Sequence, residues 1–255
     1  MWRRGALALI LLGALAAQSE RPQPPRSGIE FQGADVRALQ ADDFANPGML
    51  WVTRGEALWS AKRGAAAESC ASCHGDAARS MKGVSVTYPK HSPALGRVVS
   101  LDERINACVS GQQKAAPLEW ESEDLLSLGA YVSRQSRGMP IAVAVDGPAR
   151  ELFERGRALY FERQGQLHLA CDQCHDRNWG RTLLAESISQ GHPADWPAYR
   201  LEWQSLGSLQ RRLRACFFGV RAAQPAFGSR DLLALEIYLA DRARGLTVSP
   251  PGVRR

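Results

Sequence analysis

The chain has 255 residues, of which 45% are hydrophobic and 23% charged, and its formal net charge is +6. This balance is ordinary for a folded protein and excludes an intrinsically disordered chain. The 6 cysteines are too few for a small disulfide-built fold, and four of them fall in two Cys-x-x-Cys-His strings.

The first residues predict a secretory signal peptide over residues 1–17. Arg3 and Arg4 form a basic start, and the apolar run from Ala6 to Leu15 is too short to span a bilayer. A buried N-terminal helix is the alternative, but no polar residue alternates along the run. We therefore expect export to a bacterial periplasm, and no membrane span in the mature chain.

The rest of the chain repeats one plan, which indicates a duplication. Four blocks recur in the same order and at nearly the same spacing. The matched blocks are Arg54–Trp59 with Arg155–Tyr160, Cys70–His74 with Cys171–His175, Arg104–Cys108 with Arg212–Cys216, and Asp124–Leu128 with Asp231–Leu235. About seven extra residues separate the second and third blocks in the second copy.

The apolar pattern of each copy predicts helices. Residues at i, i+3 and i+7 form one apolar face on the last helix of each copy. These residues are Leu125, Leu128 and Val132 in the first copy and Leu232, Leu235 and Leu239 in the second. Residues 55–62 and 148–163 also have a helical pattern, and no sustained alternation marks a strand. We therefore expect an all-α fold.

In an exported protein, Cys-x-x-Cys-His is the attachment signature of c-type haem. Two thiols on one helical turn bind the haem vinyl groups, and the adjacent histidine becomes the proximal iron ligand. A thioredoxin-like pair would follow a strand, and zinc would need two more ligands near each string. We therefore expect two covalently attached haems. Their attachment residues are Cys70, Cys73, Cys171 and Cys174, and their proximal ligands are His74 and His175.

Together these features predict two tandem cytochrome c-like domains related by duplication. The breakers between Gly138 and Pro148 mark a linker. The expected division is a signal peptide (1–17), an N-terminal extension (18–52), a first domain (53–138), a linker (139–148), a second domain (149–245) and a tail (246–255).

The second copy has no methionine of its own to serve as the sixth iron ligand, because all 4 methionines of the chain precede Cys171. The candidates in that half are His168, His192 and Cys216. His168 lies only three residues before Cys171 and is poorly placed to reach the opposite face of the haem. His192 lies in a Gly-His-Pro loop, where we expect a solvent-exposed side chain.

Cys216 has an equivalent in the first copy, Cys108, whereas neither histidine has a matching histidine. The repeat therefore favours a thiolate ligand at both irons, giving the ligand pairs His74/Cys108 and His175/Cys216. A thiolate donates charge to the iron and lowers its reduction potential. The competing account is a Cys108–Cys216 disulfide, which would be natural in an oxidising compartment.

An arginine-rich segment surrounds Cys216. On a helix, Arg212 lies one turn before Cys216 on the same face, where its charge favours the thiolate and suits sulfate or sulfonate oxygens. Arg211 and Arg214 fit a solvated basic face. We expect no nucleic-acid binding, because the net charge is modest, haem propionates offset it and aromatic residues do not interleave with the arginines.

The chain resembles the SoxA family, the dihaem subunit of the periplasmic L-cysteine S-thiosulfotransferase of bacterial sulfur oxidation. The resemblance covers roughly residues 31–244. It rests on Gln40–Gly48, on both haem strings and on the segment Arg212–Cys216. It implies that Cys216 is both an axial haem ligand and the catalytic residue of the second domain, often carried as a persulfide, and that Arg212 contacts substrate.

The resemblance also implies a reaction and partners. Thiosulfate is joined through its outer sulfur to a cysteine of a carrier protein, SoxY, and two electrons leave through haem to a monohaem partner, SoxX, in a heterodimer. Cys108 would be a ligand without access to substrate. Two alternatives remain: a dihaem thiosulfate dehydrogenase that forms tetrathionate, and a plain dihaem electron carrier.

Overall fold

The structure, a computed structural model, describes residue 22 and residues 24–255. The predicted signal peptide lies outside these residues. Within the part described, no helix combines the length and the hydropathy that crossing a membrane requires.

Helices make up most of the regular structure. The α-helices are α1 (Ala34–Ala41), α2 (Met49–Ser60), α3 (Cys70–His74), α4 (Ala77–Ser80), α5 (Leu101–Gly111), α6 (Glu123–Arg134), α7 (Arg150–Phe161), α8 (Cys171–His175), α9 (Leu209–Gly219) and α10 (Arg230–Arg242). Short 3-10 helices are η1 (Gly28–Phe31), η2 (Ser85–Thr87), η3 (Pro93–Leu95) and η4 (Gly147–Ala149). The strands are β1 (Lys90–Ser92), β2 (Arg97–Val99), β3 (Thr182–Leu183), β4 (Glu186–Ser187), β5 (Ala198–Arg200), β6 (Ser205–Gly207) and β7 (Gly252–Arg254).

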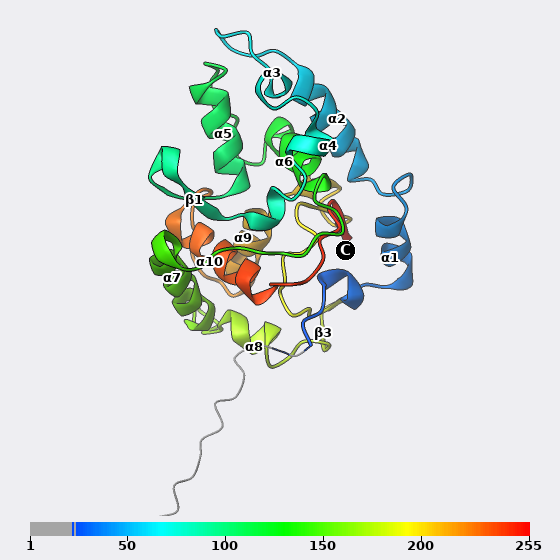
Figure 1. Ribbon diagram of the computed structural model, residues 1–255. Helices are drawn as coiled ribbons and strands as arrows, with labels where there is room; N and C mark the ends of the chain where they lie inside the picture. The colour runs from blue at the N-terminus through cyan, green and yellow to red at the C-terminus, as the bar shows by residue number, and fades with distance from the viewer. Residues whose placement is uncertain (1–21, 23) are drawn as a thin grey trace, which may run out of the picture.

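The two halves of the chain have the same helical plan, as Figure 1 shows. We call residues 24–138 the first half and residues 149–255 the second half. In the first half α2 packs against α6, and in the second half α7 packs against α10. The helices α3 and α8 carry the haem strings, while α5 and α9 carry Cys108 and Cys216. The helix predicted over residues 55–62 begins earlier, at Met49.

Serine side chains start equivalent helices in the two halves. The Ser100 Oγ accepts a hydrogen bond from the Glu103 backbone N–H at the start of α5, and Ser208 Oγ accepts one from Arg211 at the start of α9. Ser122 caps α6 in the same way that Ser229 caps α10. Each cap satisfies a backbone donor that the first turn of a helix leaves without a partner.

Left-handed backbone positions also recur in pairs. The matched pairs are Ala67 and His168 (φ 51° and 53°), Lys114 and Arg221 (φ 54° and 57°), and Gly138 and Gly245 (φ 78° and 86°). Residues other than glycine rarely adopt this conformation. Its recurrence at matched positions therefore supports the duplication that the sequence indicates.

Two glycines let the main helices of each half approach closely. A Cβ atom at Gly55 would lie 2.1 Å from the carbonyl oxygen of Ser127 on α6. A Cβ atom at Gly156 would lie 1.9 Å from the carbonyl oxygen of Ala234 on α10. Because backbone atoms cannot move aside as a side chain can, both helix pairs need glycine at these crossings.

The all-α prediction is wrong, because the described residues also form small sheets. An antiparallel hairpin, β1–β2, pairs Lys90 with Val99, and the equivalent hairpin β5–β6 pairs Ala198 with Gly207 in the same register. A further hairpin, β3–β4, lies in the second half. Strands of two or three residues are too short to show an alternating apolar pattern, which is why the sequence did not reveal them.

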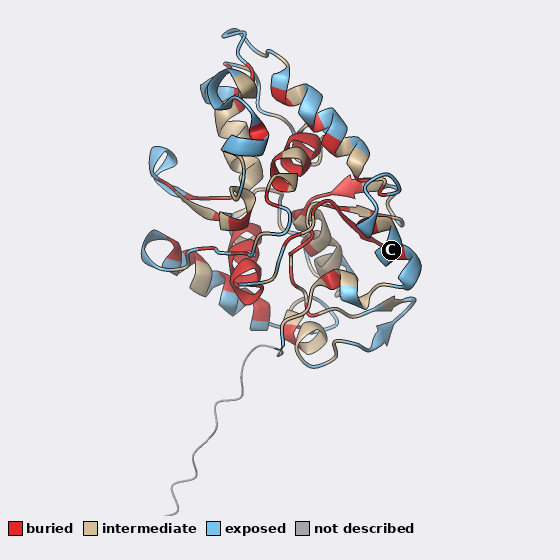
Figure 2. Ribbon diagram, turned by 45° about the vertical axis from the view of Figure 1, so that its right-hand side comes forward, coloured by how far each residue is buried: buried red, intermediate tan, exposed pale blue. Residues whose placement is uncertain are grey.

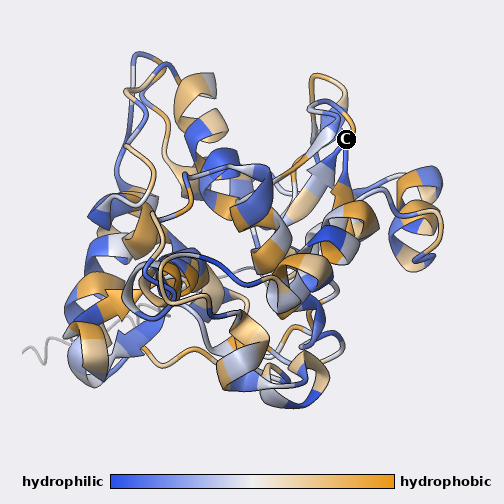
Figure 3. Cartoon of the chain, turned by 90° about the horizontal axis from the view of Figure 1, so that it is seen from above, coloured by the Kyte–Doolittle hydropathy of each residue, from blue (hydrophilic) through white to orange (hydrophobic). Residues whose placement is uncertain are grey.

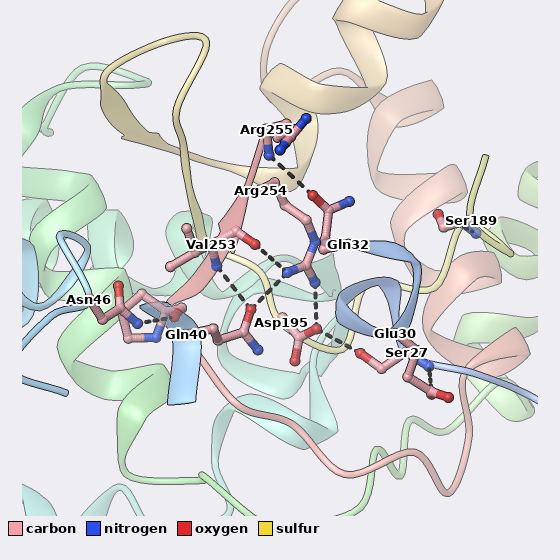
Figure 4. A network of polar contacts seen from close by, with 12 residues as sticks. Ser27, Glu30, Gln32, Gln40, Asn46, Ser189, Asp195, Val253, Arg254 and Arg255 are labelled. Atoms are coloured by element: carbon pink, nitrogen blue, oxygen red, sulfur yellow. Dashed lines mark hydrogen bonds and ion pairs between the residues drawn. The ribbon is translucent and has the colours of Figure 1, made fainter. Parts of the chain in front are cut away.

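The C-terminal strand β7 pairs in parallel with β5 of the second half. Figure 4 shows the polar network around them, in which the buried Arg254 forms an ion pair with Asp195. Ser27 Oγ donates a hydrogen bond to the same carboxylate at 2.6 Å. The Gln40 Oε1 accepts hydrogen bonds from Arg254 Nη1 at 2.7 Å and from the Val253 N–H at 2.9 Å. The N-terminal extension and the tail are thereby held together.

The core consists of apolar clusters within each half and between the halves, and Figure 2 shows the buried residues. All six residues of the predicted apolar faces on α6 and α10 are buried, at most 4% exposed. In α10 the burial extends to polar residues such as Glu236 and Arg242. The outer helices carry both hydrophilic and hydrophobic residues, as Figure 3 shows.

Residues 139–148, which the sequence predicts as a linker, run alongside residues near the C-terminus. The Ile141 N–H donates a hydrogen bond to the Leu246 carbonyl oxygen at 3.0 Å. Ile141 and Val143 are both buried in an apolar cluster with Val248. This segment therefore contributes to the core between the halves.

Candidate functional site

In the first half, a cavity of about 330 Å³ brings together the predicted haem residues. Cys70, Cys73 and His74 of α3 line it, and so does Cys108 of α5. Burial, followed by the negative charge of the Cys108 thiolate, raises the pKa of the Cys70 thiol. The predicted proximal and distal ligands of the first iron thus face one common space.

Apolar side chains form much of the remaining wall of this cavity. They include Trp59, Leu101, Leu128 and Val132. Met81 also lines the cavity, and it packs in the apolar cluster that contains Cys70. An apolar space with a histidine and sulfur ligands has the chemistry that a haem requires.

The residue after each predicted proximal histidine accepts a hydrogen bond from an aromatic side chain, on α2 in the first half and on α7 in the second. The Trp59 Nε1 donates a hydrogen bond to the Gly75 carbonyl oxygen at 2.9 Å. In the second half the Tyr160 hydroxyl donates one to the Asp176 Oδ1 at 2.8 Å. Trp59 and Tyr160 occupy equivalent positions, and each fixes the end of its haem-string helix, α3 or α8. The acceptor is a backbone carbonyl oxygen in the first half and a side-chain carboxylate in the second.

The imidazole of His175 is fixed by its backbone surroundings. Its Nδ1 lies 2.7 Å from the carbonyl oxygen of Ser189. Because a carbonyl oxygen only accepts hydrogen bonds, Nδ1 is the donor in this contact, which fixes the orientation of the ring. A Cβ atom at Gly191 would lie 3.0 Å from the His175 ring, so the glycine leaves room for it.

The sequence did not identify Ser189 as a partner of His175. It also did not explain the roughly seven extra residues that separate the second and third matched blocks in the second copy. These residues form the β3–β4 hairpin, which runs from Thr182 to Ser187 and leads directly to Ser189. No residue type marks a backbone carbonyl as a hydrogen-bond acceptor. The length difference between the two copies was the only available signal.

Cys216 lies close to both His175 and Arg212. Burial raises the pKa of the Cys216 thiol, but the charge of Arg212 and a hydrogen bond from His175 oppose it. The charge of Arg200 acts in the same direction, and the resulting pKa is lowered to about 7. A substantial fraction of the free thiol is therefore ionised at neutral pH.

The two predicted attachment cysteines of the second half lie near Cys216. Burial, then the charge of Cys216, raises the pKa of Cys171 to about 12 and also raises the pKa of Cys174. Together with His175, they form a cluster that faces Cys216. The structure therefore brings the predicted attachment cysteines and the two predicted iron ligands of the second half together.

The three arginines of α9 have different surroundings. The Arg211 guanidinium carbon lies 4.2 Å from the Trp203 ring centroid, and that of Arg214 lies 4.4 Å from the Phe227 ring centroid. Within the described part of the chain, no hydrogen bond or ion pair engages the Arg212 side chain. Arg212 is therefore the arginine of α9 that remains available to an anion beside Cys216.

A fourth arginine, Arg200 of β5, was missed by sequence reasoning. Its side chain is 4% exposed, and its Nη2 binds Glu186 at 2.8 Å and Glu202 at 2.7 Å. Two carboxylates thus share one buried guanidinium near the cysteine. The sequence gives no sign of this, because the hairpin that positions Arg200 was not expected.

The other predicted ligand candidates are placed differently. His168 is exposed and occupies a left-handed turn (φ 53°). His192 was expected to be solvent-exposed, and this is wrong: it is 5% exposed. None of the 6 cysteines, all of which are described, forms a disulfide. Cys108 and Cys216 belong to separate sites in this structure.

Comparisons with known proteins agree with this picture. A family model described as SoxA/TsdA, cytochrome c domain, matches residues 54–141. The L-cysteine S-thiosulfotransferase subunit SoxA of Rhodovulum sulfidophilum is 36% identical over 255 residues, which cover 96% of this chain and 89% of that protein. The subunit of the same name from Pseudaminobacter salicylatoxidans is 40% identical over 230 residues, covering 90% and 80%.

A solved structure is similar over nearly the whole length. The crystal structure of SoxXA from P. pantotrophus has a TM-score of 0.88 and 36% sequence identity, with 91% of this chain and 87% of that chain covered. Fold, cysteine strings and family model define a c-type cytochrome, which carries covalently attached haem c. More particularly, the chain belongs to the SoxA family of L-cysteine S-thiosulfotransferase subunits.

Proposed function

We propose that this chain is the catalytic dihaem subunit of a periplasmic L-cysteine S-thiosulfotransferase. It joins thiosulfate to a cysteine of a SoxY-like carrier protein. Two electrons pass to a monohaem SoxX-like cytochrome with which the chain forms a heterodimer. The observation that supports this most is the convergence of His175, Cys216 and Arg212 in the second half.

The overall reaction is an oxidation. Thiosulfate and the carrier thiol form one sulfur–sulfur bond, and one proton and two electrons leave: S₂O₃²⁻ + R–SH → R–S–S–SO₃⁻ + H⁺ + 2 e⁻. Haem, held in the second half by Cys171, Cys174 and His175, would supply the acceptor for these electrons when bound. Sulfur bonded to an oxidising metal can accept a second sulfur nucleophile, which a free thiolate cannot.

The side chains of the second half have distinct roles in this reaction. Cys216 Sγ forms the bond to the outer sulfur of thiosulfate. The carrier thiolate then attacks that sulfur and releases the Cys216 thiolate, as in thiol–disulfide exchange. Arg212 binds the sulfonate oxygens through charge-assisted hydrogen bonds. His175 would be a ligand of the haem iron, and the Ser189 carbonyl oxygen fixes the orientation of its ring.

We further propose that the first half holds a second haem through Cys70, Cys73, His74 and Cys108. The 330 Å³ cavity that these four residues line supports this assignment. Cys108 would act there as a ligand and would not meet thiosulfate. The tandem-domain division predicted from the sequence, with catalysis in residues 149–245, is part of the same proposal.

The reaction is tested by analysing its products. The purified haem-loaded chain with its cytochrome partner is incubated with thiosulfate, carrier protein and an electron acceptor. We expect a thiosulfonate bound to the carrier cysteine, detected by the increase in the carrier's mass. Free tetrathionate would instead indicate a thiosulfate dehydrogenase, and haem reduction without a sulfur product would indicate a plain electron carrier. Either result would overturn the proposal.

Arg212→Ala is expected to raise the KM for thiosulfate about 10- to 100-fold. This corresponds to the loss of one charged hydrogen-bond pair, about 1.5–3 kcal/mol. Steady-state kinetics measures the effect, and Arg221→Ala, an exposed arginine just beyond α9, is the matched control. If Arg212→Ala and the control gave the same KM as the unaltered chain, Arg212 would not bind substrate.

A further inference from the structure

Two carboxyl groups from different halves line one cavity, the half-buried Asp102 and the buried Glu236. Asp102 lies in the first turn of α5, and Glu236 lies on α10. Both line a cavity of about 140 Å³ that is separate from the haem cavity of the first half. Glu236 is only 8% exposed. The proposed sulfur chemistry uses neither residue.

The two carboxyl groups have few hydrogen-bond or ion-pair partners among the described residues. Neither forms an ion pair with the described residues. Glu236 accepts a hydrogen bond from Gln210, while its Oε2 is buried without a hydrogen-bond partner. Burying a charged carboxylate without a cation is costly, and the usual way to avoid the cost is to bind a proton.

The duplication explains how the carboxyl groups come together. Asp102 and Gln210 occupy equivalent positions on α5 and α9, and Gly129 and Glu236 occupy equivalent positions on α6 and α10. The Asp102 Oδ1 would lie 3.2 Å from a Cβ atom at Gly129. The small residue in one half thus makes room for a carboxyl group, and the other half supplies the second carboxyl group.

The charged neighbours of the pair are also acidic. Burial raises the pKa of Asp102 to about 7, and the charges of Glu121 and Glu103 add to this effect. Burial, then the charge of Asp102, raises the pKa of Glu236 well above its ordinary value, and Glu103 adds to it. The cations in this region act on the acidic neighbours: Arg97 forms an ion pair with Glu103 at 2.6 Å, and the charges of Arg211 and Arg214 act on Glu121.

The cavity that Asp102 and Glu236 line adjoins the haem cavity of the first half. Leu101 and Tyr88 line both cavities, so these two side chains separate Asp102 from the space that holds the cofactor. On the other side, Leu209 of α9 closes the carboxyl cavity toward the second half. A charge placed on the haem would therefore act on the pair through protein, where screening by water is weak.

We propose that the Asp102–Glu236 pair binds a proton when the haem of the first half is reduced. One electron enters the iron, one proton from solvent binds one carboxylate, and the summed charge of the haem and the pair stays constant: Fe(III) + e⁻ + –COO⁻ + H⁺ → Fe(II) + –COOH. The inference rests on the haem that the proposed function places at His74 and Cys108. It gives that haem a role in coupling electron flow to proton uptake.

The test is a potentiometric titration of the haem-loaded chain from pH 5.5 to 8.5, followed by visible absorption. We expect the potential of one haem to fall as the pH rises, by up to about 59 mV for each tenfold fall in proton concentration. Asp102→Asn and Glu236→Gln should each flatten this dependence. Glu56→Gln, an exposed carboxylate on α2 of the same half, should retain it.

A second measurement detects the proton directly, so it holds even if a substitution changes the reduction potential of the haem. Infrared difference spectra between oxidised and reduced protein should contain the carbonyl band of a newly protonated carboxylic acid, and Glu236→Gln or Asp102→Asn should remove it. A pH-independent potential of the unaltered chain, or a dependence that survives both substitutions, would overturn the proton site. Intact mass is measured first: absence of haem at Cys70 and Cys73 would contradict both proposals, whereas an attached haem with no pH dependence would contradict only this one.

Discussion

Replacing Cys216 with alanine is expected to lower the rate of thiosulfate transfer roughly a thousandfold or more. The substitution removes the sulfur that we propose forms the first bond to thiosulfate and, at the same time, a proposed ligand of the iron. Covalent attachment should persist, because it needs Cys171 and Cys174, which stay in place on α8. Intact mass and the rate of carrier modification, measured on one preparation, give both results.

Cys108→Ala is the matched control for this experiment. Cys108 occupies the equivalent place on α5 in the first half, so its loss removes a proposed iron ligand of the same kind without removing the sulfur that bonds to thiosulfate. We expect transfer to continue in this variant at a reduced or normal rate. Normal transfer by Cys216→Ala, or equal loss in both variants, would contradict the assignment of catalysis to the second half.

Gly156→Ala is expected to lower the free energy of unfolding by about 3 kcal/mol, the upper end of the usual range for overpacking a core. The added methyl group would lie 1.9 Å from the carbonyl oxygen of Ala234 and 2.9 Å from the Cβ of Tyr238. The two helices must separate to admit it, which weakens the packing of the whole second half. Thermal unfolding should show a fall in Tm of about 10 °C.

The matched control is Gly111→Ala, at the end of α5. A Cβ atom there would meet no other atom within 4 Å. Since alanine favours a helix over glycine by about 0.5–1 kcal/mol, this variant should be as stable as the unaltered chain or slightly more so. Equal Tm values for the two variants would contradict the close helix crossing at Gly156.

The sequence predicted the features that depend on residue identity and spacing. The haem strings, the matched cysteines and the apolar faces of α6 and α10 could all be found because the duplication shows each of them twice. The placement of Arg212 beside Cys216 also followed from helical spacing. The iron ligands themselves remain a prediction, because the structure brings the residues together without the cofactor.

The sequence did not predict features that depend on contacts between distant segments. The strands are two or three residues long, and β7 pairs with β5 from the far end of the chain. Ser189 acts through a backbone carbonyl group, which any residue has. Burial of Arg200 and His192 depends on segments packed over them. Asp102 and Glu236 come together only when the two halves pack.

The central claim is that the iron of the second half is bound by His175 and the Cys216 thiolate. Electron paramagnetic resonance of the oxidised, haem-loaded chain tests it most directly. We expect a low-spin ferric signal typical of histidine–thiolate ligation that Cys216→Ala removes and Cys108→Ala retains. A spectrum typical of two histidines or of histidine and methionine in the second half, or a signal unchanged by Cys216→Ala, would contradict the claim.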